Sequence, residues 1–255
     1  MENSSSFWVR FYKNYERLVE GIYHIYETIV NIPLIFKNIN ITIKYMYEIG
    51  VETFPLVVFT SIFVGIITAL QANYQFDDLV PKIFLGTAIL KAIVTELAPV
   101  IMALVMSSRY ASATAAELGT MAVSEQINAM IVLGLNPIRF LFTPRIVAGI
   151  IMFPVITILS DVFSYLGAMA TSVFFLNVPA YIFIEGSKKF FFVFDVVVGL
   201  IKAAVFGFIV TYVGCIFGYM TKNGAKGVGE STMNAVVWAD ILILIFDFIV
   251  AWLLF

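Results

Sequence analysis

The stretch FPLVVFTSIFVGIITAL, Phe54–Leu70, contains no charged residue and lies inside a longer uncharged segment, Thr53–Phe76. A helix needs about 20 consecutive apolar residues to cross the hydrocarbon core of a bilayer. The rest of the 255-residue chain is similar in character, with 61% hydrophobic and only 13% charged residues. An average soluble domain carries about 25% charged residues. The sequence therefore predicts an all-α membrane protein that crosses the bilayer several times.

Four further apolar segments are long enough to span a membrane, although each carries one or two ionisable residues. With the first segment they predict five transmembrane helices, at about Thr53–Phe76, Phe84–Ser108, Ile146–Phe175, Val193–Met220 and Val236–Phe255. No repeat or soluble domain interrupts the chain, so it is predicted to be one domain, 1–255, with its transmembrane bundle in 51–255.

Residues 1–50 precede the bundle and contain two stripes with helical spacing. Aromatic and aliphatic residues recur every three or four positions from Phe7 to Ile22, and Arg10, Lys13 and Arg17 form a basic stripe. This pattern is typical of an amphipathic helix that lies in the membrane interface. The alternative is a soluble helix packed on a partner.

The distribution of basic residues predicts the orientation, because cytoplasmic loops are enriched in Lys and Arg. Three basic residues fall on one side of the predicted bundle: Lys82, Lys188 and Lys189. Ten fall on the other side: Arg10, Lys13, Arg17, Lys37, Lys44, Arg109, Arg139, Arg145, Lys222 and Lys226. The N-terminus is therefore predicted to be cytoplasmic and the C-terminus external.

Ionisable residues inside the membrane are costly and normally face a cavity or a partner. Glu96, Asp161, Lys202 and Asp247 fall inside four different predicted spans. They predict either a polar cavity within the bundle or ion pairs such as Glu96–Lys202 or Lys202–Asp247. The alternative to a functional role is structural, with paired charges that only fix the helix register.

The composition excludes several classes of function. A net charge of −2 gives no basic surface for nucleic acid. One cysteine, Cys215, and one histidine, His24, cannot form a His/Cys metal cluster. The segment GAKGVGES, residues 224–231, approaches the phosphate-binding P-loop pattern, but Glu230 stands where that motif needs lysine. We therefore expect no cofactor in this chain, and any ATP must be bound by another subunit.

Two ordered blocks of sequence carry a family resemblance. The first is ELAPVIMALVMSSRYASATAAELGTMAVSEQINAMIVLGLNPIRFLFTPRIVAG, residues 96–149, and the second runs from Asp195 to Val237 and includes GAKGVGESTMNAVV. Both resemble the MlaE/YrbE family, the permease subunits of MCE-type lipid ABC transporters. The sequence departs from the family pattern at Ala98, where glycine is usual, and at Thr95, where arginine is common.

The resemblance implies a homodimeric permease of the inner membrane, whose C-terminus would lie in the periplasm. Its implied partners are cytoplasmic ABC ATPase subunits that bind the ATP, an MCE-domain protein on the external face and a small STAS-type cytoplasmic subunit. The implied substrate is a phospholipid or similar apolar lipid, moved between the inner membrane and the outer envelope to maintain outer-membrane lipid asymmetry.

The resemblance also assigns candidate site residues. An ABC permease receives work through a cytoplasmic coupling helix, and Ser112–Met130 is predicted to be that helix. Thr114 and Glu117 fit a capping box, and Gly119 is predicted to divide the helix. The alternative is a re-entrant or solvated loop. The candidate coupling residues are Glu117, Gly119, Thr120, Ser124, Glu125, Gln126, Arg139 and Arg145.

The polar residues of a lipid cavity at the dimer interface are predicted to be Glu96, Lys202 and Asp247. No catalytic or metal-binding residue is predicted. Two alternatives remain to lipid transport. One is a scaffold that anchors an MCE protein without transporting, and the other is an intramembrane enzyme that modifies lipids.

Overall fold

The computed structural model describes residues 23–28, 30–32, 39–76 and 81–254, which form helices joined by short turns. The elements are α2 (Ile39–Gly50), α3 (Phe54–Gln75), α4 (Ile83–Ala92), η2 (Ile93–Leu97), α5 (Ala98–Met106), η3 (Ser107–Ala111), α6 (Ser112–Val123), α7 (Gln126–Val132), η4 (Ile138–Phe142), α8 (Thr143–Phe174), α9 (Ala180–Lys189), α10 (Val193–Tyr219) and α11 (Gly224–Leu254). The three elements labelled η are π-helical turns. The predicted interfacial helix of residues 7–22 lies outside the described residues.

Five helical segments of the described chain are long and apolar enough to cross a membrane, which confirms the predicted fold class. They are Ile39–Gln75, Ile83–Val123, Ile138–Phe174, Val193–Tyr219 and Gly224–Leu254. Several are longer than predicted, because hydropathy detects only the part of a helix that lies in hydrocarbon. A helix satisfies its own backbone hydrogen bonds, so it can continue into water without an end signal.

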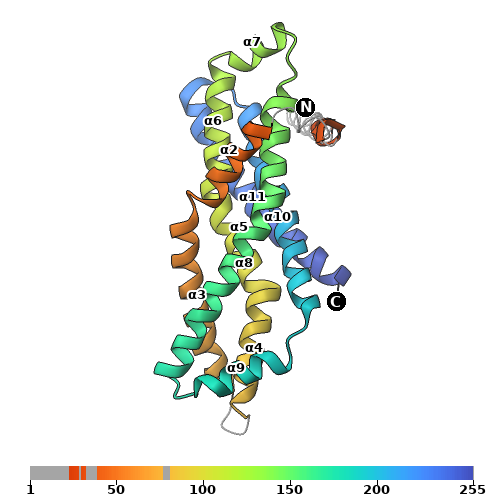
Figure 1. Ribbon diagram of the computed structural model, residues 1–255. Helices are drawn as coiled ribbons and strands as arrows, with labels where there is room; N and C mark the ends of the chain where they lie inside the picture. Colours follow the sequence, from red (N-terminus) through yellow and green to blue (C-terminus); the bar gives the residue numbers. More distant parts are fainter. Residues whose placement is uncertain (1–22, 29, 33–38, 77–80, 255) are drawn as a thin grey trace, which may run out of the picture.

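The helices form an elongated bundle with α7 at one end and α9 at the other (Figure 1). Helices α3 and α8 pack closely along the bundle, since a Cβ atom on Gly65 would lie 1.9 Å from the Ser164 carbonyl oxygen. The Ser61 hydroxyl also donates to the Ser160 hydroxyl at 2.9 Å. Small residues and buried hydroxyls are typical of contacts between helices in membranes.

The predicted coupling helix Ser112–Met130 differs from the structure in three respects. Its first part, α6, continues directly from the second span through η3, so Thr114 is not at a helix start and forms no capping box. The helix passes through Gly119 without a break, because that glycine packs against Thr221. The division falls at Glu125 instead, where a left-handed φ of 60° separates α6 from α7.

Candidate functional site

A cluster of three charged side chains lies inside the membrane-spanning part of the bundle. Lys202 on α10 is fully buried, and its Nζ atom lies 2.6 Å from Glu96 Oε2 on η2 and 2.8 Å from Asp247 Oδ1 on α11. Lys202 is nine residues from the start of α10, which places it about 14 Å along a helix that rises 1.5 Å per residue. The cluster therefore lies well inside the spanning helix and not at its end.

Both predicted ion pairs thus form, and they share one lysine. A buried charge in a low-dielectric interior needs a partner, because its desolvation otherwise costs several kcal/mol. The lysine has two carboxylate partners, which leaves the cluster with one excess negative charge. The side chain of Glu96 is 43% exposed and that of Asp247 is 22% exposed. The cluster therefore presents carboxylate to the surface of the chain, while its lysine stays inside.

The π-helical turn η2 positions Glu96. In this turn the backbone N–H of Ala98 donates to the carbonyl of Ile93, five residues earlier. Single π-turns inside α-helices are frequent at functional sites, because the extra residue redirects the side chains around it. The fourth intramembrane candidate, Asp161 on α8, accepts no hydrogen bond at its buried Oδ1 atom from any residue in the described part of the chain.

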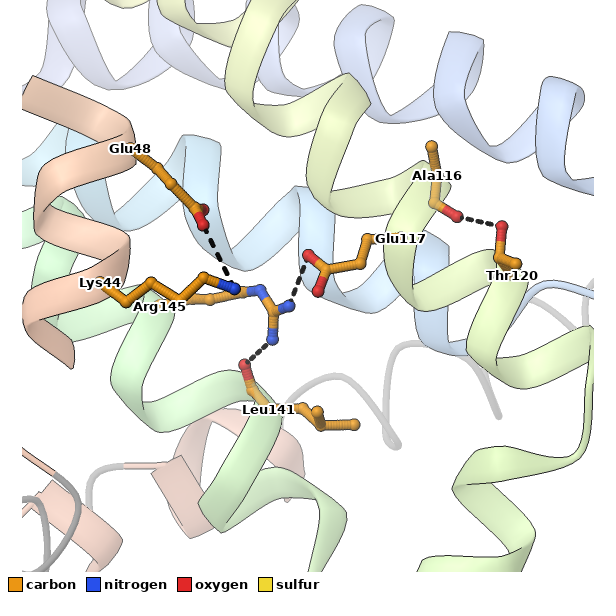
Figure 2. Close-up of polar contacts among 7 residues, drawn as sticks. All are labelled: Lys44, Glu48, Ala116, Glu117, Thr120, Leu141 and Arg145. Carbon is orange, nitrogen blue, oxygen red and sulfur yellow. Dashed lines mark hydrogen bonds and ion pairs between the residues drawn. The ribbon is translucent and has the colours of Figure 1, made fainter. Parts of the chain in front are cut away.

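A second charged group lies toward the α7 end of the bundle. The Arg145 side chain on α8 is only 1% exposed, and its Nη2 atom lies 2.7 Å from Glu117 Oε2 on α6 (Figure 2). Its Nη1 atom donates to the Leu141 carbonyl at 2.8 Å, and its guanidinium lies 4.2 Å from the centre of the Tyr45 ring. Arg145 therefore ties α2, α6 and α8 together and offers almost no surface to a partner protein.

The other predicted coupling residues lie mostly on the surface. The Thr120 and Ser124 hydroxyls donate to the carbonyls four residues earlier, at 2.8 Å and 2.7 Å. Gln126 donates to the Ser124 hydroxyl at 2.9 Å, and Glu125 accepts a hydrogen bond from Asn128. These contacts organise the turn between α6 and α7.

Two further predicted coupling residues are placed differently. Arg139 on η4 is partly buried, and its guanidinium lies 5.6 Å from the Phe140 ring centre. Gly119 lies inside the bundle, where an added Cβ would be 2.9 Å from the Thr221 hydroxyl oxygen. Both positions favour a role in supporting the α7 end.

The apolar tip of this end was not predicted from the sequence. Ile131, Val132 and Leu133 are 51%, 86% and 75% exposed, and Gly134 follows with a φ of 74°. The signal was the run IVLGL, residues 131–135, directly after the polar stretch. An exposed apolar patch with a polar rim is characteristic of a protein contact. The tip is thus a better candidate for the centre of a docking surface than the carboxylates beside it.

The fold and these sites define a class of protein: a polytopic α-helical membrane protein with a buried charge cluster and a projecting polar and apolar end. The comparisons identify the family. The sequence model of the family "Permease MlaE" matches residues 42–253. The chain belongs to this family of ABC transporter permeases.

Individual relatives agree with this assignment. A probable ABC transporter permease protein of Rickettsia typhi is 34% identical over 229 residues, which cover 90% of this chain and 87% of the relative. A probable ABC transporter permease protein of Synechocystis is 34% identical over 241 residues, covering 94% of this chain and 92% of the relative. The chloroplastic protein trigalactosyldiacylglycerol 1 of Arabidopsis thaliana is 35% identical over 210 residues, which cover 82% of this chain and 60% of the relative.

Proposed function

We propose that this ABC transporter permease moves phospholipids, or similar apolar lipids, between the inner membrane and the outer envelope. In this proposal the protein is a homodimer in the inner membrane and maintains the lipid asymmetry of the outer membrane. Cytoplasmic ATPase subunits hydrolyse the ATP, an MCE-domain protein accepts or delivers lipid on the external face, and a STAS-type subunit binds on the cytoplasmic side. The N-terminus is cytoplasmic and the C-terminus is periplasmic.

The Lys202 cluster is the observation that carries this proposal. An intramembrane cluster that exposes carboxylate, held by a buried lysine, offers negative charge to the polar part of a lipid headgroup, while the surrounding helices are apolar. Such a polar group within a hydrophobic surface suits an amphiphilic substrate. The name of the Arabidopsis relative also refers to a lipid.

The α7 end supports the ATP-driven part of the proposal. Its apolar tip, Ile131–Leu133, is flanked by the polar turn at Ser124–Gln126. The pair Glu117–Arg145 holds α6, which leads to this turn, against α8. A short projecting helix with an apolar centre and a polar rim has the anatomy of a protein interface. The ATPase would dock on this tip, with Glu125 and Gln126 at the rim.

The test is transport by the reconstituted complex. The permease, its ATPase and its MCE partner are placed in proteoliposomes with labelled phospholipid, and ATP-dependent transfer of lipid to acceptor vesicles is measured. Lys202→Met should lower the rate at least tenfold without dissociating the dimer, because the carboxylates lose their counter-charge. The matched control is Lys226→Met, since the Lys226 side chain is 86% exposed.

Three results would count against the proposal or the site that carries it. Absence of ATP-dependent lipid transfer by the wild-type complex, with the MCE protein still bound, would favour the scaffold. Chemical turnover of lipid by the purified chain alone would favour an enzyme. Unchanged transfer by Lys202→Met would remove the cluster from the substrate path.

A further inference from the structure

A second polar site lies where α2, α6 and α8 meet. A pocket of about 110 Å³ is lined by Glu48, Glu52, Arg109, Tyr110, Ala113, Thr114, Glu117 and Arg145. One molecule of liquid water takes up about 30 Å³, so the pocket has room for several atoms of a polar ligand. It is separate from the Lys202 cluster, because no residue of that cluster lines it.

Two residues that line the pocket have a buried hydrogen-bond donor without a partner in the described part of the chain. The Tyr110 side chain is only 6% exposed, and its hydroxyl has no hydrogen-bond partner among the residues the structure describes. The Arg145 Nε atom is likewise buried and unpartnered within the described chain. Buried donors are satisfied in nearly all protein structures. Two such groups on residues that line one pocket are available to donate to a ligand that accepts hydrogen bonds.

The charges around these donors have both signs. Arg109 lies 3.9 Å from Glu52, and both side chains are about half exposed, which makes this pair weak. Glu48 pairs with Lys44 at 3.6 Å, but the Lys44 side chain is 69% exposed. Figure 2 shows the Glu117 carboxylate against the Arg145 guanidinium, whereas the Glu48 carboxylate faces the ammonium of Lys44 on the same helix, α2.

Three carboxylates and two guanidinium groups thus line the pocket. A simple anion would be repelled by the carboxylates, and a simple cation would leave the donors unused. A group with one phosphate and one ammonium would pair its phosphate with the donors and guanidinium groups and its ammonium with the carboxylates.

The height of the pocket indicates where such a group comes from. Helix α3 begins at Phe54 and has 22 residues, so it is about 33 Å long, close to the roughly 30 Å thickness of the hydrocarbon core. Glu52 lies two residues before this helix and therefore at the level of the lipid headgroups. Val51 and Phe54, on either side of it, are 54% and 43% exposed, as expected for side chains that contact acyl chains.

We propose that this pocket binds the zwitterionic headgroup of a membrane phospholipid, of the phosphoethanolamine type, from the leaflet at the α7 end. The phosphate accepts hydrogen bonds from the Tyr110 hydroxyl, Arg145 Nε and Arg109. The ammonium lies against Glu48 and Glu52. This site goes beyond the proposed transport function and rests only on the membrane insertion of the chain.

The experiment measures lipid retention by the purified full-length protein. The protein is washed in detergent, exposed to equal phosphatidylethanolamine and phosphatidylglycerol, and analysed by native mass spectrometry. Wild type should retain phosphatidylethanolamine preferentially. Tyr110→Phe removes one hydroxyl with little change of shape and should weaken retention about tenfold, the loss expected for one hydrogen bond to a charged group. Arg109→Gln should weaken retention similarly, and the exposed Lys226→Gln should not.

Two competitors identify the form of the ligand. Soluble glycerophosphoethanolamine at millimolar concentration should compete poorly, because it lacks acyl chains, and inorganic phosphate should not compete. Strong displacement by either would show that the site takes a free phosphate compound rather than a lipid, and would overturn the proposal.

Equal retention of both lipids, or normal retention by both Tyr110→Phe and Arg109→Gln, would also overturn it. The ATP-dependent transfer assay is a separate readout. Loss of transfer with normal retention contradicts only the proposed function, and normal transfer with loss of selective retention contradicts only this site.

Discussion

The Glu117–Arg145 pair should stabilise the α7 end, and its contribution can be calculated from the structure. At 2.7 Å and an effective dielectric constant of about 20, the Coulomb energy of two unit charges is about 6 kcal/mol. The Glu117 side chain is 51% exposed, so water screens much of this attraction. We therefore expect a coupling energy of about 2–3 kcal/mol between the two side chains.

The measurement is a double-mutant cycle on the free energy of unfolding, obtained by reversible unfolding in mixed micelles. Glu117→Gln should cost about 2–3 kcal/mol, because it leaves the Arg145 charge buried without its carboxylate. Arg145→Met should cost about 3–5 kcal/mol, because it also loses the Leu141 carbonyl and the Tyr45 ring. The double variant should be less destabilised than the sum of the two by the coupling energy.

The control for the cycle is Glu125→Gln. Glu125 is exposed at the turn before α7, and we expect this change to alter stability by less than about 0.5 kcal/mol. Strictly additive effects of Glu117→Gln and Arg145→Met would refute the reasoning. A large loss of stability in Glu125→Gln would show that the whole turn is sensitive and that the pair is not special.

Three other substitutions test the remaining contacts. Val132→Asp should reduce the amount of ATPase that co-purifies with the permease at least tenfold with unchanged stability, because it places a charge in the exposed apolar tip. Co-purification of the ATPase at the wild-type level would exclude the tip as the docking centre. Gly65→Ala should lower the yield of folded protein, since its Cβ would lie 1.9 Å from the Ser164 carbonyl oxygen. The control Gly229→Ala should be tolerated, because an added Cβ there has no atom within 4 Å. Equal yields of the two variants would refute the close α3–α8 contact. Lys202→Arg should retain more lipid transfer than Lys202→Met, because it keeps the positive charge between the two carboxylates; equal rates would show that charge is not what matters there.

The fold class was predictable because hydropathy reports directly on transfer into lipid. Long uncharged or weakly charged segments have few alternatives to a spanning helix, and all five were found. The pairs of Lys202 were also predictable, since a lysine within an apolar span needs a carboxylate and the sequence offers only a few. What the sequence could not give is the π-turn at η2 that directs Glu96 to Lys202.

The helix ends were less predictable, for a physical reason. Thr114 and Gly119 have the local preferences of a helix start and a helix break, but both lie inside a helix because α6 packs on α10 and α11. The free energy of packing α6 against its neighbours outweighs local helix-end preferences of about 1 kcal/mol. The same burial turned Arg145, a candidate surface contact, into an internal support. Neither outcome can be inferred without knowing which helices are neighbours.

The two charged groups are connected by one helical rod. The second span runs without a break from Ile83 to Val123. It carries Glu96 about one third of the way along and Glu117 near its α7 end, 21 residues further, or about 32 Å. The π-turns η2 and η3 are the two places where its hydrogen-bond register changes, and adding or losing one residue there rotates the following segment by about 100°. Glu117 is fixed to α8 through Arg145, and Glu96 is fixed to α10 through Lys202. The second span is therefore held at both charged groups, and η3 is the π-turn that lies between them.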